Sequence, residues 1–161
     1  MTFISQSEES ESVISVHSEL RWQRREQEIS RWFVRPKARK RAKQTVWFGG
    51  VEIDAELLTV LTLFKRMRIE TEFSCAGVSL LDEPEEHSLY AYITFPASAR
   101  TEVFVRLAMK RMKHRLLVTY EPGRNRYDLS SFYIGHNRSF CLLMERCVRA
   151  LMQLEEGAES S

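Results

Sequence analysis

Cysteine is scarce in this chain, and long apolar runs are missing. The 161 residues include three cysteines, Cys75, Cys141 and Cys147, and no two of them form a C-x-x-C pair. Such a sparse, odd set fits a reducing compartment and argues against a disulfide scaffold. No apolar run approaches the ~20 residues that span a membrane, and the opening MTFISQSEESES lacks the basic and apolar regions of a secretory signal. We therefore expect a cytoplasmic protein without a membrane partner.

Metal-ligand and nucleotide-loop motifs are missing as well. The cysteines and the histidines at positions 87, 114 and 136 include no pair at zinc-ligand spacing. Neither G-x-x-x-x-G-K-[ST] nor G-x-G-x-x-G occurs. We expect no metal, no cofactor and no catalytic constellation, so a binding protein is favoured over an enzyme.

Charge is distributed unevenly, and its distribution divides the chain. Residues 1–18 carry six serines and three glutamates without Lys or Arg, which is typical of a disordered tail. Residues 19–44 are predicted to form a basic amphipathic arm, with Ser18 as helix N-cap and Pro36 as the helix terminator. Between Arg21 and Lys43 lie ten Lys or Arg against two Glu. Residues 45–154 then form a domain, and 155–161 an acidic, disordered tail.

The domain alternates strand and helix patterns. Its first strand breaks at Gly49-Gly50, Asp54 is expected to cap the first helix, Pro96 to open the second, and Asn137 to cap the last. The predicted strands and helices, in order, are 46–53, 54–68, 69–74, 88–95, 96–114, 116–122, 126–135 and 137–154. This order predicts an α+β fold with a mostly antiparallel sheet of four to five strands and helices on one face, nearest to a ferredoxin-like variant.

Clustered cations with interleaved aromatic residues make nucleic acid, RNA or DNA, the first partner to consider. Clustered cations release counterions from a phosphate backbone, and aromatic faces stack on unpaired bases. The alternative is a solvated charge face with a flexible linker, since runs of like charge repel. The candidate contacts are Arg35, Lys37, Arg39, Lys40, Arg41, Lys43, Arg106, Lys110, Lys113, Arg124, Arg126 and Arg138.

A protein partner is the second hypothesis. Trp22, Trp32 and Phe33 lie in the arm, and large aromatic residues anchor many interfaces. They could dock an inhibitor or adaptor onto a larger machine, or a nucleoprotein complex. They could equally pack against the chain's own domain or a homodimer partner.

The stretch TEFSCAGVS raises a third hypothesis. A strand runs into Ser74, Cys75 and Gly77, whose small side chains and backbone N–H groups could form a ligand edge. An RNA-modifying or nucleotide-processing enzyme could use this turn, with His87 and His136 as candidate bases. A buried cysteine that fills space is the simpler interpretation, because cysteine is among the most buried residue types.

Residues 53–77, IDAELLTVLTLFKRMRIETEFSCAG, resemble a pattern in small uncharacterised bacterial and phage proteins. They are also distantly similar to the Ser-Ser-Cys-Ser-Gly stretch of the wybutosine-synthesis tRNA methyltransferase family. The first resemblance implies an accessory or counter-defence protein, and the second implies RNA modification with S-adenosylmethionine. The matching positions are Thr71, Ser74, Cys75 and Gly77, whereas Ala76 and Val78 stand in place of that family's next serine and its arginine.

Overall fold

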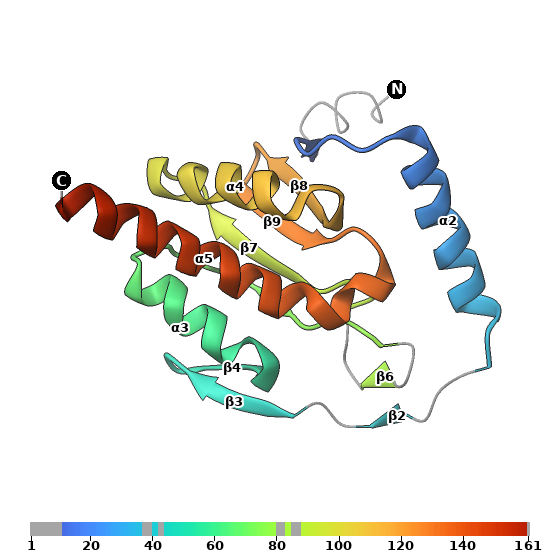
Figure 1. Cartoon of the computed structure of the whole chain (residues 1–161). Helices are drawn as coiled ribbons and strands as arrows, with labels where there is room; N and C mark the ends of the chain where they lie inside the picture. Colours follow the sequence, from blue (N-terminus) through green and yellow to red (C-terminus); the bar gives the residue numbers. More distant parts are fainter. Residues whose placement is uncertain (1–10, 37–39, 42–43, 80–82, 85–87, 161) are drawn as a thin grey trace.

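A five-stranded antiparallel sheet organises the computed structural model, which describes residues 11–36, 40–41, 44–79, 83–84 and 88–160. The strand order is β1-β8-β9-β7-β5 (Figure 1). Every neighbouring pair in this sheet is antiparallel. The strands are β1 (Ser12–Val13), β5 (Ser74–Cys75), β7 (Tyr92–Pro96), β8 (Leu116–Glu121) and β9 (Arg126–Ser131).

The connection from β7 to β8 places the fold near the ferredoxin-like topology. Helix α4 (Ala99–Met112) joins these two strands, and β9 lies between them in the sheet. This split β-α-β unit is the core of that topology. Edge strand β5 lies on the other side of β7 and precedes β7 in the chain. The predicted α+β class and antiparallel sheet are confirmed.

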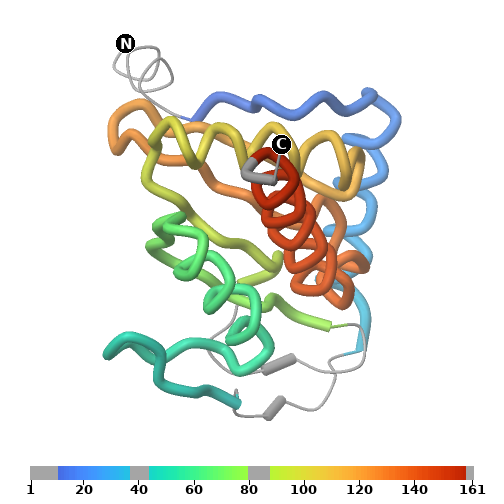
Figure 2. Tube along the Cα trace, turned by 60° about the vertical axis from the view of Figure 1, so that its left-hand side comes forward, coloured from blue at the N-terminus to red at the C-terminus, as the bar shows by residue number. Residues whose placement is uncertain are grey.

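Helices α3 (Leu58–Arg66), α4 and α5 (Asn137–Ser160) cover one face of the sheet, and α5 lies between the other two (Figures 1 and 2). Alternate sheet residues such as Ile93, Phe95 and Leu129 point into the core beneath them. Phe64 of α3 and Phe104 of α4 meet Phe95 edge-on or tilted. This continuous apolar layer holds the domain together.

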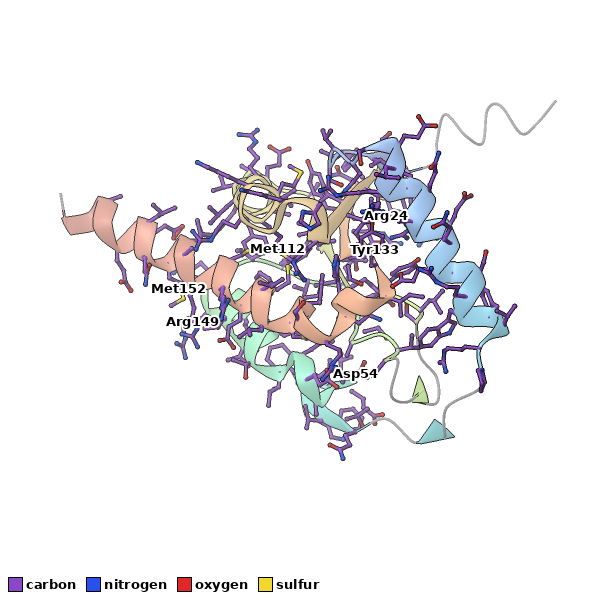
Figure 3. All side chains as sticks on the ribbon, turned by 45° about the vertical axis from the view of Figure 1, so that its right-hand side comes forward. Arg24, Asp54, Met112, Tyr133, Arg149 and Met152 are labelled. Carbon is purple, nitrogen blue, oxygen red and sulfur yellow. The ribbon has the colours of Figure 1, made fainter. Side chains whose placement is uncertain are left out.

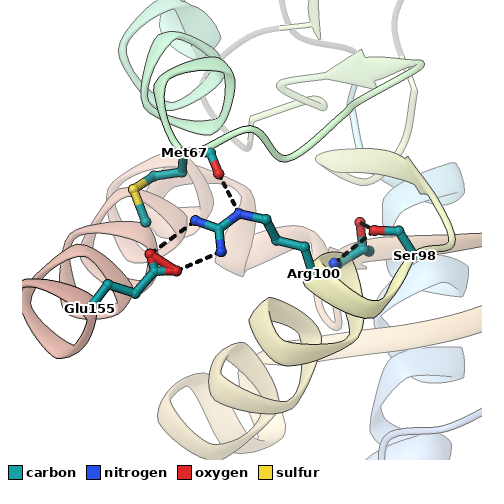
Figure 4. Close-up of polar contacts among 5 residues, drawn as sticks. Met67, Ser98, Arg100 and Glu155 are labelled. Carbon is teal, nitrogen blue, oxygen red and sulfur yellow. Dashed lines mark hydrogen bonds and ion pairs between the residues drawn. The ribbon is translucent and has the colours of Figure 1, made fainter. Parts of the chain in front are cut away.

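A guanidinium fixes the three helices at one end. Arg100 of α4 donates two hydrogen bonds to the Glu155 carboxylate of α5, at 2.6 and 3.0 Å, and a third to the Met67 carbonyl at the end of α3 (Figure 4). The bidentate geometry makes this pair more specific than an ordinary surface ion pair. Helix α5 extends to Ser160, through most of the segment 155–161 that is predicted to be disordered.

Helical backbone begins at Ala55 and at Asn137, within one residue of the predicted starts, but the second helix begins later than Pro96 and the expected caps differ. Asp54 does not cap a helix with its side chain, since its carboxylate accepts the N–H of Ala76. Pro96 ends β7, and Ser98 caps α4 by accepting the Thr101 N–H at 3.0 Å. The Asn137 side chain forms its hydrogen bonds with other segments of the chain.

Two predicted strands differ in shape. The 46–53 strand is a hairpin, β3 (Thr45–Phe48) and β4 (Val51–Asp54), that stands outside the main sheet. Gly49 and Gly50 form its two-residue turn, both with positive φ as such a turn requires. The predicted 69–74 strand is regular only at β5, although Glu72 and Phe73 still exchange backbone hydrogen bonds with Thr94.

The N-terminal region folds back onto the domain. Residues 11–18 belong to the segment predicted to be disordered, yet β1 pairs with β8 and the Ile14 N–H reaches the Val118 carbonyl at 2.8 Å. Ser18 caps α2 (Glu19–Val34), which ends before Pro36 as predicted. The short strands β2 (Lys40–Arg41) and β6 (Glu83–Pro84) pair in parallel. Residues 1–10 lie outside the described residues.

Candidate functional site

The turn after β5 is a packed structural element. Cys75 is buried, and its Sγ accepts N–H groups from Gly77 at 3.4 Å and Ser88 at 3.3 Å. Asp54 accepts the N–H of Ala76 at 2.8 Å. These donors are therefore already used within the protein, which favours the space-filling interpretation of the turn over a ligand edge.

Asn137 binds this turn to the sheet. Its Nδ2 donates to the carbonyls of Val78 at 2.7 Å and Leu89 at 2.9 Å. Its Oδ1 accepts the Ala91 N–H at 2.8 Å and the Ser131 hydroxyl. A buried amide with two donors and two accepting lone pairs is thus fully satisfied, which is the condition for burying it without a penalty.

The other members of the predicted ligand edge lie apart. Ser74 lines a groove beside the β3–β4 hairpin. His136 packs against Tyr133 and His114, with ring centroids 5.0 and 6.2 Å away. Burial, and then the charges of Arg115 and His114, lower the pKa of His136 to about 4. The His136 ring therefore packs in an aromatic cluster rather than beside the turn.

Helix α2 docks through the aromatic residues that were candidate interface anchors. Trp32 is 3% exposed and packs with Val78 and Ile134. Trp22 meets the Phe132 ring at 5.0 Å, edge-on. Trp22 and Trp32 therefore pack against the chain's own domain, whereas the Phe33 side chain is 63% exposed.

Charged residues of α2 complete the docking. The Arg25 guanidinium lies 4.0 Å from the Tyr90 ring centroid and donates to the Phe132 carbonyl. The Glu28 carboxylate accepts the N–H groups of Ile134 and Gly135 at 2.6 and 3.0 Å. Tyr133, labelled in Figure 3, reaches α2 by donating its hydroxyl to a backbone carbonyl. The helical part of the arm is therefore part of the folded domain.

The docked helix creates a groove rich in cations, which we call the cationic groove. It has a volume of about 570 Å³ and lies between residues 14–16, the start of α2 and the end of α4. No Asp or Glu occurs among the described residues that line it. Its lining comprises Ile14, Ser15, Val16, Arg21, Met109, Lys110, Lys113 and His114.

Lys113 adopts an unusual backbone conformation in this groove. Its φ of 52° and ψ of −124° belong to a region that glycine dominates, and such a conformation costs about 1–3 kcal/mol in a non-glycine residue. His114 follows Lys113 in the chain and also lines the groove. Burial, followed by the charges of Arg21, Arg115 and Lys113, lowers the pKa of His114. Arg21, Lys110 and Lys113 line the groove without a described carboxylate, so positive charge is concentrated there.

The remaining predicted cations are scattered. Arg126 is 14% exposed and lies 2.7 Å from Glu121 and 3.6 Å from Glu72, so its charge is offset. Arg106 lies 4.0 Å from Glu102 in its own helix. Arg124 and Arg138 are exposed in the β8–β9 turn and the first turn of α5.

In the part of the chain that the structure describes, the basic stretch after α2 adds few side chains to a nucleic-acid surface. The Arg35 guanidinium lies 3.6 Å from the Trp32 ring centroid. Lys40 and Arg41 form β2, with Lys40 in register with Glu83. Lys37, Arg39 and Lys43 lie outside the described residues.

Sequence reasoning found Lys110 and Lys113 but missed Arg21 and His114. The wheel of the predicted helix 96–114 placed Lys110 and Lys113 on its exposed arc. Lys110 lies on α4, whereas Lys113 follows the last residue of that helix. Arg21 joins them only because α2 folds back, and no local pattern encodes that contact.

The described residues give little support for metal binding or for a reactive thiol. They contain no group of three or more His, Cys, Asp or Glu arranged to hold a metal ion. Burial is the largest cause that raises the pKa of Cys141 to about 12 and that of Cys147 to about 11, so these thiols resist ionisation.

Comparisons with family models, with curated proteins and with solved structures find no match for this chain. Within the described part of the chain, no helix has the length and apolarity needed to cross a membrane.

Proposed function

We propose that this protein is an accessory nucleic-acid-binding protein whose cationic groove holds a phosphate backbone. The observation that carries the proposal is the convergence of Arg21, Lys110 and Lys113 on one groove whose described lining contains no carboxylate. Cations grouped in this way gain binding free energy by releasing counterions from nucleic acid.

The strained backbone of Lys113 adds support. A glycine at this position would adopt the observed φ of 52° without strain, but it would remove the ammonium group from the groove. Strain of this kind is often found where a side chain serves a site. The lowered pKa of His114, caused in part by its cationic neighbours, fits a surface that favours an anion.

Contacts of this type recognise the backbone rather than the base sequence. The apolar side chains of Ile14, Val16 and Met109 lie alongside the cations and offer surface to sugars or bases. The segment that bears Ile14 is held in place by the β1–β8 pairing, so the groove is formed before any ligand binds.

The test is a fluorescence-anisotropy titration with labelled single-stranded RNA and double-stranded DNA at several salt concentrations. The double variant Lys110→Gln/Lys113→Gln is compared with the wild type. Removing one cation that neutralises a phosphate should reduce the salt slope by roughly 0.7–0.9. For the double variant we therefore expect a slope smaller by about 1.4–1.8 and weaker binding at every salt concentration.

Arg149→Gln is the control, because it also removes a cation. Arg149 lies on α5 (Figure 3) and pairs with Glu145 at 3.3 Å. It should bind as the wild type does. Equal binding by the double variant and the wild type would refute the proposal, as would the absence of salt-dependent binding.

A further inference from the structure

A second groove, which we call the hairpin groove, lies at another part of the surface. It has a volume of about 460 Å³ and separates the β3–β4 hairpin from the last turn of α3 and from residues 69–74. Figure 1 shows this hairpin beside α3. The groove shares no lining residue with the cationic groove. Its floor is apolar, with Phe48, Val51, Ile53, Leu61 and Ile69, and its size is that of a small-molecule site.

Charges of both signs line this groove. Lys65 lies in α3, and Arg68, Glu70 and Glu72 follow in the segment after it. Glu72 is already within 3.6 Å of Arg126 on β9. Among the described residues, no carboxylate forms an ion pair with Lys65 or Arg68. The Lys65 ammonium lies 5.5 Å from the Phe48 ring centroid. The groove therefore offers two cations that form no ion pair with a described carboxylate, and Glu70 as an acceptor.

Arg68 occupies a position where glycine is the usual residue. Helix α3 ends in a Schellman motif, in which the N–H of Arg68 reaches the Lys65 carbonyl and the N–H of Ile69 reaches the Phe64 carbonyl. The motif places Arg68 at φ 60°, in the left-handed region. Arg100 fixes the adjacent Met67 carbonyl (Figure 4). The chain thus holds a strained arginine, in a defined place, at the edge of the groove.

We propose that the hairpin groove binds a nucleotide, either free or as an unpaired nucleotide in a strand. The base would lie on Phe48 and the aliphatic floor, because an aromatic face stacks on any base. It would replace the Lys65 ammonium, which lies 5.5 Å from the Phe48 ring centroid. Lys65 and Arg68 would bind the phosphate, and Glu70 would accept a hydrogen bond from an exocyclic amine. A fatty acid fits less well, because its alkyl chain has no amine to donate to Glu70 and no ring to stack on Phe48.

Two ligands distinguish the two sources of a nucleotide. Adenosine monophosphate and an unphosphorylated tetra-adenylate are titrated separately, and the methyl resonances of Val51, Leu61 and Ile69 are followed by NMR. Shifts with both ligands, or with the monophosphate alone, support a site for free nucleotides. Shifts with the tetranucleotide alone support an unpaired nucleotide in a strand. No shift of these methyl groups with either ligand overturns the proposal.

The deciding variant is Arg68→Gly, which removes the guanidinium and relieves the backbone strain. It should weaken binding about 10-fold while leaving the melting temperature unchanged or higher. Asn125→Gly is the matched control, because Asn125 also has positive φ, 50°, but lies in the β8–β9 turn. Unaltered affinity in Arg68→Gly would overturn the role of the guanidinium.

The site stands apart from the cationic groove. Lys110→Gln/Lys113→Gln should leave the monophosphate shifts intact, so failure of either proposal is seen without the other. Phe48→Leu tests the aromatic face, since leucine keeps an apolar floor. We expect it to weaken binding about 5-fold, and wild-type affinity in this variant would argue against base stacking.

Discussion

A β-carbon at Gly77 would come within 2.6 Å of the Asn137 Nδ2 atom and within 2.6 Å of the Ala91 nitrogen. Gly77 also has φ 78°, which L-residues rarely adopt. The small residues of the turn after β5 are therefore explained by packing. The backbone must approach the Asn137 amide so closely that only a hydrogen atom fits between them.

Gly77→Ala should destabilise the protein strongly. The added methyl group clashes with a buried amide and a backbone nitrogen, and the positive φ adds strain, so we expect a loss of about 3–5 kcal/mol in the free energy of unfolding. Urea unfolding measures it. Gly157→Ala is the control, because a β-carbon there meets nothing within 4 Å, and its stability should be unchanged or slightly higher. A loss of less than about 1 kcal/mol in Gly77→Ala would contradict this close packing.

The three thiols should react slowly in the folded protein. Cys75 and Cys147 are buried, and burial raises the pKa of Cys141 to about 12. Because the thiolate is the reactive form, a disulfide reagent at pH 7 should label the native chain far more slowly than a free thiol. In urea all three should react at once. Rapid labelling of native Cys75 would instead revive the hypothesis of a nucleophile in the turn.

Asp128 gives the protein a distinctive response to pH. Burial raises its pKa to about 6, and its Oδ1 has no hydrogen-bond partner in the described part of the chain. The pKa of Asp128 is about 6 in the folded chain and 3.8 in the unfolded chain. Its carboxylate therefore lowers the free energy of unfolding fully above pH 6, and this destabilisation disappears as the pH falls from about 6 to below 3.8. Asp128→Asn should therefore raise stability at pH 7 by about 1–2 kcal/mol, after a discount for partial exposure, and give no gain at about pH 4.

His136 changes the stability of the protein with pH in the opposite direction. The pKa of His136 is lowered to about 4, chiefly by burial, so the stability linked to its neutral form is complete above pH 6.5 and is lost as the pH falls toward 4. In Asp128→Asn, unfolding free energy should thus decrease more steeply between pH 6.5 and 4 than in the wild type. The exposed Glu52→Gln is the control and should leave both quantities unchanged. Equal slopes in Asp128→Asn and the wild type would contradict the assigned environment of Asp128.

Local patterns predicted what local physics determines. The spacing of Phe104, Val105 and Ala108 identified the buried face of α4, and the turn before Arg126 identified the β8–β9 hairpin. Ser18 and Pro36 gave the ends of α2 because capping and the missing proline N–H act within one turn.

What could not be predicted depends on contacts between distant segments. Asp54 and Asn137 are residue types that commonly cap helices. The side chain of each instead forms a hydrogen bond with a segment more than twenty residues away. The polar sequence of residues 155–161 predicts a frayed tail, but Glu155 forms an ion pair with Arg100 of α4. Likewise the cationic groove exists only because Trp32 and Arg25 dock α2, which brings Arg21 next to α4.

The most direct measurement of the proposed function is the nucleic-acid affinity of Lys113→Gly, taken together with its melting temperature. Glycine accepts the backbone conformation at position 113 and removes the side chain with its ammonium group from the cationic groove. We predict affinity for labelled single-stranded RNA about 10-fold weaker than that of the wild type, with an unchanged or higher melting temperature, and wild-type affinity in the Asn125→Gly control. Wild-type affinity in Lys113→Gly would contradict the assignment of the cationic groove as the nucleic-acid contact.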